Sequence, residues 1–235
     1  MLIWISEQNA VRAADDRVIS AARISAANVR QTVTATLDKL AGIDEALGSD
    51  PAKFNLSGIP GADGFIGLYS ATGDTIGRDG QRGASVSSNA EFQALAQGKP
   101  WSITPLIGAA DSPIRLFGIA HRIDREGEFG GVITAFFPAD YLSDTWSIVD
   151  LGPDSTVGLF RDDGEMVTRY PVPDTSINLK DYELFTQHLP RASSGAYRAT
   201  SPVDGHDRTV GYEALKDLGL IAIVSMSQSS TSGAF

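Results

Sequence analysis

Residues 66–78 read IGLYSATGDTIGR, and 91 positions later residues 157–169 read VGLFRDDGEMVTR. Each stretch has a strand-like run, a turn with a glycine (Gly73 or Gly164), and a second strand-like run, the pattern of a β-hairpin. The same offset pairs residues of two further strand-like regions: Ile119 with Val210, His121 with Tyr212, Val132 with Ile223, and Ile133 with Val224. We interpret these matches as two copies of one small α+β unit.

The two copies share one predicted order of elements: two strands, a helix and three strands. In the first copy, strands are expected near 64–70, 75–79, 101–107, 115–124 and 130–137, with a helix near 88–97. In the second, strands are expected near 155–161, 165–170, 195–201, 207–215 and 219–226, with a helix near 179–188. This order is PAS-like and predicts one five-stranded antiparallel sheet in each copy.

A long helix is predicted ahead of the two copies. Residues 6–47 contain no proline and only one glycine, Gly42, and their apolar residues recur at steps of three, four and seven. At about 1.5 Å per residue, some 40 helical residues form a rod of roughly 60 Å, more than one small unit covers. We therefore expect a weak parallel homodimer along the N-terminal half of this helix.

Three segments follow from this organisation: the long helix (1–48), a first unit with a short linker helix near 138–148 (49–148), and a second unit (149–235).

The net charge of −10 and the absence of a cluster of basic residues argue against nucleic-acid binding. Cysteine is absent and the three histidines lack metal-ligand spacing, so no metal or other cofactor is expected. No run of 18 apolar residues is present.

The long helix followed by two PAS-like units resembles the double Cache sensor family of bacterial transmembrane receptors. Further matching stretches are 130–135 (GGVITA), 140–142 (DYL), 159–171 (LFRDDGEMVTRYP) and 194–205 (SGAYRATSPVDG) with Arg208. The resemblance implies an extracytoplasmic (periplasmic) domain of an inner-membrane protein. In the family, membrane spans precede the long helix and follow the last strand, so the membrane would be reached only through segments outside this sequence.

The resemblance also implies a non-catalytic ligand sensor, most often that of a histidine kinase. The alternatives are a diguanylate cyclase, a chemoreceptor, or a stand-alone periplasmic binding protein. The family's small-molecule ligand usually binds the membrane-distal unit, which is the first unit here. The candidate ligand-binding residues in that unit are Tyr69, Phe92, Trp101, Arg115, Phe117, His121, Thr134 and Phe136.

A subfamily of these sensors holds amino acids through an Arg-x-Trp-Tyr motif and an aspartate. At the positions of the motif this sequence has Asn89, Glu91 and Phe92. The position of the family's aspartate falls near Phe136. Arg115 and His121 are expected on one strand face, where they could hold a carboxylate; the alternative for His121 is a sheet histidine satisfied by a neighbour. We therefore expect an anionic or neutral ligand without an α-amine, and no comparable ligand in the second unit.

Overall fold

The computed structural model describes residues 2–62, 65–77, 80, 82–108, 115–149, 151–152 and 154–228. The chain divides into two compact units. The distal unit comprises Thr32–Ile107 and Leu116–Pro138. The proximal unit comprises Met1–Gln31, Gly108–Arg115 and Ala139–Phe235.

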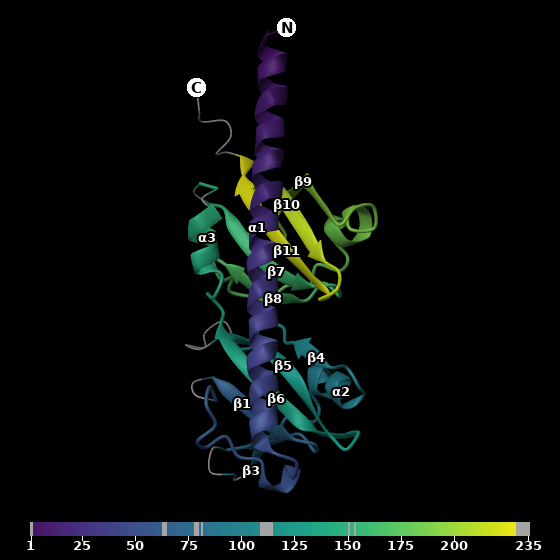
Figure 1. The fold of residues 1–235 in the computed structure, drawn as a ribbon. Helices are drawn as coiled ribbons and strands as arrows, with labels where there is room; N and C mark the ends of the chain where they lie inside the picture. Colours follow the sequence, from purple (N-terminus) through teal and green to yellow (C-terminus); the bar gives the residue numbers. More distant parts are fainter. Residues whose placement is uncertain are drawn as a thin grey trace. The chain divides into compact units, whose positions relative to one another are not determined.

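The helix α1 (Leu2–Leu47) contributes to both units (Figure 1). It starts before and ends with the predicted helix 6–47, and it stops at Gly48, whose φ of 78° ends a helix easily. No helix in the described part of the chain is long and apolar enough to cross a membrane. Val11 and Ile24 are exposed on α1, and the homodimer through this helix stays a prediction.

The distal sheet has six strands in the order β3-β2-β1-β6-β5-β4. One more strand is present than the sequence predicted, because the segment after the first hairpin pairs with the edge strand β2. The strands are β1 (Ile66–Ser70), β2 (Asp74–Ile76), β3 (Arg82–Ser85), β4 (Trp101–Ile103), β5 (Leu116–Arg125) and β6 (Glu128–Pro138). The short helices of this unit are η1 (Pro51–Lys53) and α2 (Ala90–Ala96).

The proximal sheet has the predicted five strands, in the order β8-β7-β11-β10-β9. They are β7 (Thr156–Arg161), β8 (Met166–Tyr170), β9 (Ser194–Thr200), β10 (Asp207–Leu215) and β11 (Leu220–Ser227). The helix α3 (Ser143–Val149) lies where the linker helix was expected, and the π-helical η2 (Leu184–His188) replaces the longer helix predicted near 179–188. The order β2-β1-β6-β5-β4 repeats as β8-β7-β11-β10-β9, so the internal repeat is present in the fold.

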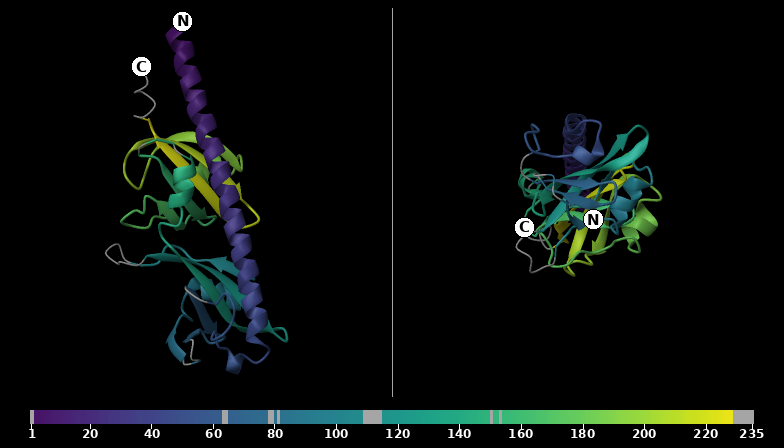
Figure 2. Two further views of the ribbon diagram at one scale, coloured as in Figure 1. Left: turned by 60° about the vertical axis from the view of Figure 1, so that its left-hand side comes forward. Right: turned by 90° about the horizontal axis from the view of Figure 1, so that it is seen from below.

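Both faces of the distal sheet are covered. On one face, Leu40 and Ile43 of α1 form a buried cluster with Ile123 and other sheet residues. On the other face, α2 packs through Phe92 and Leu95 on a cluster that includes Ala120. Figure 2 shows α1 along one side of each sheet. Consecutive strand residues therefore point alternately toward α1 and toward α2.

The offset of 91 holds in the first hairpin of each copy but not in the last strands. Gly73 and Gly164 have φ angles of 86° and 88°, as equivalent turns should. In the ladders, however, Tyr69 pairs with Val132 and its counterpart Phe160 pairs with Ile221, an offset of 89 on the last strand. The predicted pairing of Val132 with Ile223 is therefore wrong.

The same comparison corrects the pairing of His121 with Tyr212. Following the ladders across the next strand, the counterpart of His121 is Glu213, and that of Ala120 is Tyr212. The offset between equivalent residues is 91 in the first hairpin, 92 on β5 and β10, and 89 on the last strand, because the segments that join equivalent positions differ in length between the two units. A shift of one residue moves every side chain of a strand to the opposite face.

Gly211 marks the closest approach of α1 to the proximal sheet. A Cβ atom built on Gly211 would lie 2.3 Å from the carbonyl oxygen of Val18, which is in α1. Only a residue without a side chain fits there, so the helix contacts the backbone of β10 directly.

Candidate distal ligand site

A cavity of about 280 Å³ lies in the distal unit, between the α2 side of the sheet and α2 itself. The volume suits a small metabolite rather than a large cofactor. Its lining residues are Tyr69, Val86, Asn89, Glu91, Phe92, Leu95, Thr104, Ile107, Ala120, Val132, Thr134 and Phe136.

The cavity exists because β5 carries small residues on this face. Ala120 is buried beneath α2, and its methyl group leaves space in front of Phe92, Leu95 and Val132. In the proximal sheet the equivalent residue is Tyr212, which is 3% exposed and packs on Leu184 of η2. The aromatic ring fills the space in the proximal unit that Ala120 leaves open in the distal unit.

Polar groups without protein partners face the cavity. The hydroxyl groups of Tyr69 and Thr134 make no hydrogen bond within the residues that the structure describes, and burial raises the pKa of Tyr69. Asn89 precedes α2, and its side chain makes no capping hydrogen bond to the helix. By contrast, Thr104 is already engaged, since its hydroxyl accepts the N–H of Gly118 at 2.7 Å. Three neutral groups are thus available to a ligand.

The cavity is acidic rather than basic. Among its described lining residues, Glu91 is the one with a formal charge, and arginine, lysine and histidine are absent from that set. A carboxylate in such a lining favours a cationic group of a ligand. An anionic group would have to be held by neutral donors such as the Tyr69 hydroxyl and the Asn89 amide.

Four of the eight predicted site residues line this cavity, and four do not. The first group comprises Tyr69, Phe92, Thr134 and Phe136. The second comprises Trp101, Arg115, Phe117 and His121, which the structure places elsewhere. For the first group, a role in ligand binding stays a prediction. The second group does not line this cavity, so the structure gives no support for a role of these residues there.

His121 points toward α1, not toward the cavity. Its Nε2 lies 3.1 Å from a carboxylate oxygen of Asp44, which also accepts hydrogen bonds from Arg125. Burial alone would raise the pKa of Asp44, but the hydrogen bonds from His121 and Arg125 outweigh it and hold the pKa below its usual value. His121 is therefore satisfied by a neighbour, the alternative that the sequence left open. Trp101 pairs with His121 across the ladder and so shares its face of the sheet.

Arg115 and Phe117 are also structural. The Arg115 guanidinium donates to the carbonyl oxygen of Pro173, within the proximal unit. Phe117 stacks on Phe137 with ring centroids 5.2 Å apart, on the α1 side of the sheet. The sequence correctly placed Phe117 and His121 on one face, but the cavity is on the other.

Ala120, Thr104 and Val132 line the cavity and were not predicted. The available signal was the pair of small residues Gly118 and Ala120, which alternate on β5 and leave one face of that strand without bulk. The search for aromatic residues found Tyr69, Phe92 and Phe136 but could not find residues whose contribution is a small side chain.

Comparison with known proteins agrees with this architecture. Residues 139–225 match the family model dCache_1_like, described as a histidine kinase sensor domain. No curated protein sequence matches the chain.

Solved structures align over nearly the whole chain. One is the extracellular domain of the putative histidine kinase rpHK1S-Z16, with 20% identity, a TM-score of 0.62 and 99% of each chain covered. Another is the ligand-binding domain of the Pseudomonas fluorescens chemoreceptor CtaA with L-isoleucine (18% identity, TM-score 0.64, 96% of this chain and 97% of that chain). A third is the Pseudomonas aeruginosa PAO1 amino-acid chemoreceptor PctB with L-Arg (16%, 0.66, 94% and 98%).

The predicted resemblance to double Cache sensors, with its fold and its extracytoplasmic sensor class, is confirmed. The prediction of a ligand other than an amino acid is wrong, because the similar domains CtaA and PctB bind isoleucine and arginine. The prediction was wrong because it assumed that Arg115 and His121 lie on the strand face that meets the ligand, and neither residue lines the cavity.

Proposed function

We propose that this tandem Cache chain is the extracytoplasmic sensor of a membrane histidine kinase in a two-component system, and that its distal cavity binds a small amino acid. The observation that carries the proposal is the cavity of about 280 Å³, in which the Glu91 side chain and the unpartnered hydroxyls of Tyr69 and Thr134 line an otherwise largely apolar wall. The kinase class is supported by the family model matched by residues 139–225.

The chemistry assigns each end of the ligand a partner. The ammonium group lies at Glu91, where a charge-assisted hydrogen bond forms. The carboxylate is held by the Tyr69 and Thr134 hydroxyls and the Asn89 amide, which are neutral donors. The ligand side chain contacts Phe92, so an uncharged apolar side chain fits best.

Signalling follows from differential affinity. A ligand shifts a two-state equilibrium only by the ratio of its affinities for the two states, and about 1.4 kcal/mol corresponds to a tenfold shift. The ligand contacts both α2 and the sheet, so it favours the state in which α2 lies closest to Ala120 and Val132.

Calorimetry on the 235-residue chain tests the proposal. The probes are L-alanine, L-valine and L-isoleucine, each beside the carboxylic acid and the amine that lack one of its two charged groups. We expect binding of an amino acid and at least tenfold weaker binding of both analogues, and Glu91→Gln should weaken amino-acid binding at least tenfold. Glu128→Gln, an exposed change in the same unit, is the control. Tighter binding of the amine-free acids would overturn the proposal.

A chemoreceptor is the second candidate, and a specific observation favours it. The PctB domain with L-Gln superposes on this chain with a TM-score of 0.69 at 13% identity. Autophosphorylation of the full-length receptor from ATP in membrane vesicles distinguishes the two, because a chemoreceptor lacks kinase activity of its own.

A further inference from the structure

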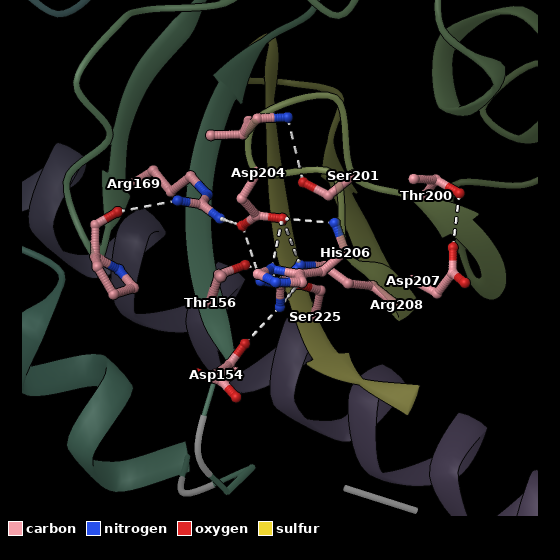
Figure 3. Close-up of polar contacts among 12 residues, drawn as sticks. Asp154, Thr156, Arg169, Thr200, Ser201, Asp204, His206, Asp207, Arg208 and Ser225 are labelled. Atoms are coloured by element: carbon pink, nitrogen blue, oxygen red, sulfur yellow. Dashed lines mark hydrogen bonds and ion pairs between the residues drawn. The ribbon is translucent and has the colours of Figure 1, made fainter. Parts of the chain in front are cut away.

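The proximal unit holds a second cavity, of about 80 Å³, on the face of its sheet that points away from Gly211 and α1. Two of its lining residues are the buried arginines Arg169 and Arg208, which are 8% and 4% exposed. Fully buried cationic side chains are rare in proteins unless they are paired or functional. The arrangement of these two guanidinium groups is shown in Figure 3.

One carboxylate, that of Asp204, serves both arginines. Its Oδ2 accepts from Nη2 of Arg169 and from Nη2 of Arg208, each at 2.8 Å. Burial alone would raise the pKa of Asp204, but the hydrogen bonds from Arg208 and from the His206 N–H outweigh it and hold the pKa far below its usual value. Asp204 is therefore ionised, and two positive charges share a single negative one.

The positive excess faces the cavity. Among the described lining residues, Arg169 and Arg208 are charged and no acidic residue is present, since Asp204 lies outside the lining. Burial is the main cause that lowers the pKa of Arg169, and the nearby charge of Arg208 adds to it. A cation in this position is stabilised by any anion that reaches it.

Arg169 also has guanidinium N–H groups that make no hydrogen bond in the described part of the chain. Its Nη1 donates to the carbonyl oxygen of Pro171 at 3.1 Å, and its Nη2 donates to Asp204. A guanidinium has five N–H donors, and the others on Arg169 have no partner within the described part of the chain. Arg208 is more fully engaged, because it also donates to the carbonyl oxygen of Asp154 and to the Ser225 hydroxyl.

The cavity is small, and apart from the arginines its lining combines apolar side chains with the hydroxyl-bearing residues Thr156, Tyr197, Thr200, Ser201 and Ser225. The apolar part of the wall is formed by Phe160, Leu179, Val203, Val210 and Ile223. At about 30 Å³ per water, the cavity has the volume of two to three water molecules. This is less than a cavity of about 150 Å³ that accommodates benzene, so a ligand has only a few non-hydrogen atoms.

We propose that the proximal cavity binds a short-chain monocarboxylate of about two to four carbons, as a second ligand site independent of the distal one. The carboxylate pairs with the free donors of Arg169, beside Arg208. The hydrocarbon chain lies against Val210 and Ile223. An inorganic oxyanion satisfies the arginines but gains nothing from the apolar wall, so acetate, propionate and butyrate fit the cavity better than phosphate.

Calorimetry on the 235-residue chain tests this site with sodium acetate, propionate and butyrate, and with phosphate and butylammonium as chemical controls. We expect saturable binding of at least one carboxylate with a Kd in the millimolar range or tighter, and none of butylammonium. Arg169→Gln should weaken binding at least tenfold, because it removes the charge while nearly keeping the volume. Arg198→Gln is the matched control, since Arg198 is an exposed arginine of the neighbouring strand that pairs with Asp15.

A second variant keeps the test decisive if Arg169→Gln fails to fold. Ala199→Leu fills the cavity from β9, beside its ladder partner Arg208, while it keeps both arginines, and it should also abolish carboxylate binding. Glu91→Gln should leave carboxylate binding unchanged, which separates this site from the distal one. The proposal is overturned if no carboxylate binds, if phosphate binds as tightly as butyrate, or if binding survives in both cavity variants.

Discussion

The two units place different residues at one structurally equivalent position, Ala120 in the distal sheet and Tyr212 in the proximal sheet. Ala120 leaves a cavity beneath α2, whereas Tyr212 fills the same space and packs on Leu184. The remaining proximal cavity is displaced along the strands to the two buried arginines. One fold thus carries a larger pocket lined by the acidic Glu91 and a smaller one lined by the basic Arg169 and Arg208.

The units also reverse the charges that join α1 to the sheet. In the distal unit the helix supplies the acid, Asp44, and the strand supplies His121 at 3.1 Å. In the proximal unit the helix supplies the base, Arg23, and the equivalent strand residue is Glu213 at 3.6 Å. The distal pair is mostly buried, whereas the Arg23 side chain is 63% exposed. We therefore expect the distal pair to contribute more to stability.

The largest expected effect comes from copying the proximal residue into the distal unit. Ala120→Tyr should fill the distal cavity and abolish the thermal shift caused by an amino-acid ligand, while the chain stays folded by circular dichroism. Ala199→Leu, which fills the proximal cavity instead, is the control and should leave the distal shift unchanged. Undiminished ligand binding by Ala120→Tyr would place the ligand outside the distal cavity.

The reverse exchange should cost stability rather than binding. Tyr212→Ala removes a buried ring from the cluster with Leu184, and it should lower the free energy of unfolding by about 3–5 kcal/mol. Tyr212→Phe keeps the ring and loses only the hydrogen bond from the hydroxyl to the Ala192 carbonyl oxygen, about 0.5–1.5 kcal/mol. Urea denaturation measures both. Equal losses would mean that the hydroxyl, not the ring, fills the role assigned here.

Asp44→Asn should lower the free energy of unfolding at pH 7 by about 1–3 kcal/mol, because His121 and Arg125 lose a charged acceptor. The folded-state pKa of Asp44 lies below its unfolded value of about 3.9. The contribution of Asp44 to the free energy of unfolding is therefore fully present at a pH above about 3.9. It is lost as the pH falls through the lower, folded pKa. Urea denaturation of wild type and variant from pH 7 downward should show the difference shrinking below about pH 4. Glu45→Gln, an exposed neighbour, should show no such convergence.

The smallest effect is expected at the equivalent proximal pair. Glu213→Gln should change the free energy of unfolding by no more than about 1 kcal/mol, since its partner Arg23 is well solvated. Raising the salt concentration should reduce the difference further. A loss as large as that of Asp44→Asn would show that the two attachments of α1 are energetically alike.

Two parts of the fold could be predicted from the sequence because local chemistry determines them. The long helix follows from an apolar period with no proline, and its end follows from Gly48. The hairpins follow from Gly73 and Gly164, which need positive φ angles. Each of these signals is complete within a short window of residues.

The face of β5 that meets a ligand could not be predicted, for a physical reason. Both faces of β5 carry buried apolar residues, because α1 covers one face and α2 the other. Period-two counting groups Phe117 with His121 but does not say which helix they meet. The ungapped repeat predicted the wrong partner for His121 for a related reason: the offset on β5 and β10 is 92 rather than 91, so Tyr212 lies on the face opposite that of His121.

The glycine at position 211 has a mechanical consequence. Because β10 has no side chain there, the α1 backbone at Val18 sits in a notch of the proximal sheet. Sliding the helix along its axis by one residue, about 1.5 Å, would push neighbouring bulk against the rim of that notch. Within the proximal unit, we therefore expect the helix and the sheet to move together, so that a displacement of α1 along its axis also displaces β10.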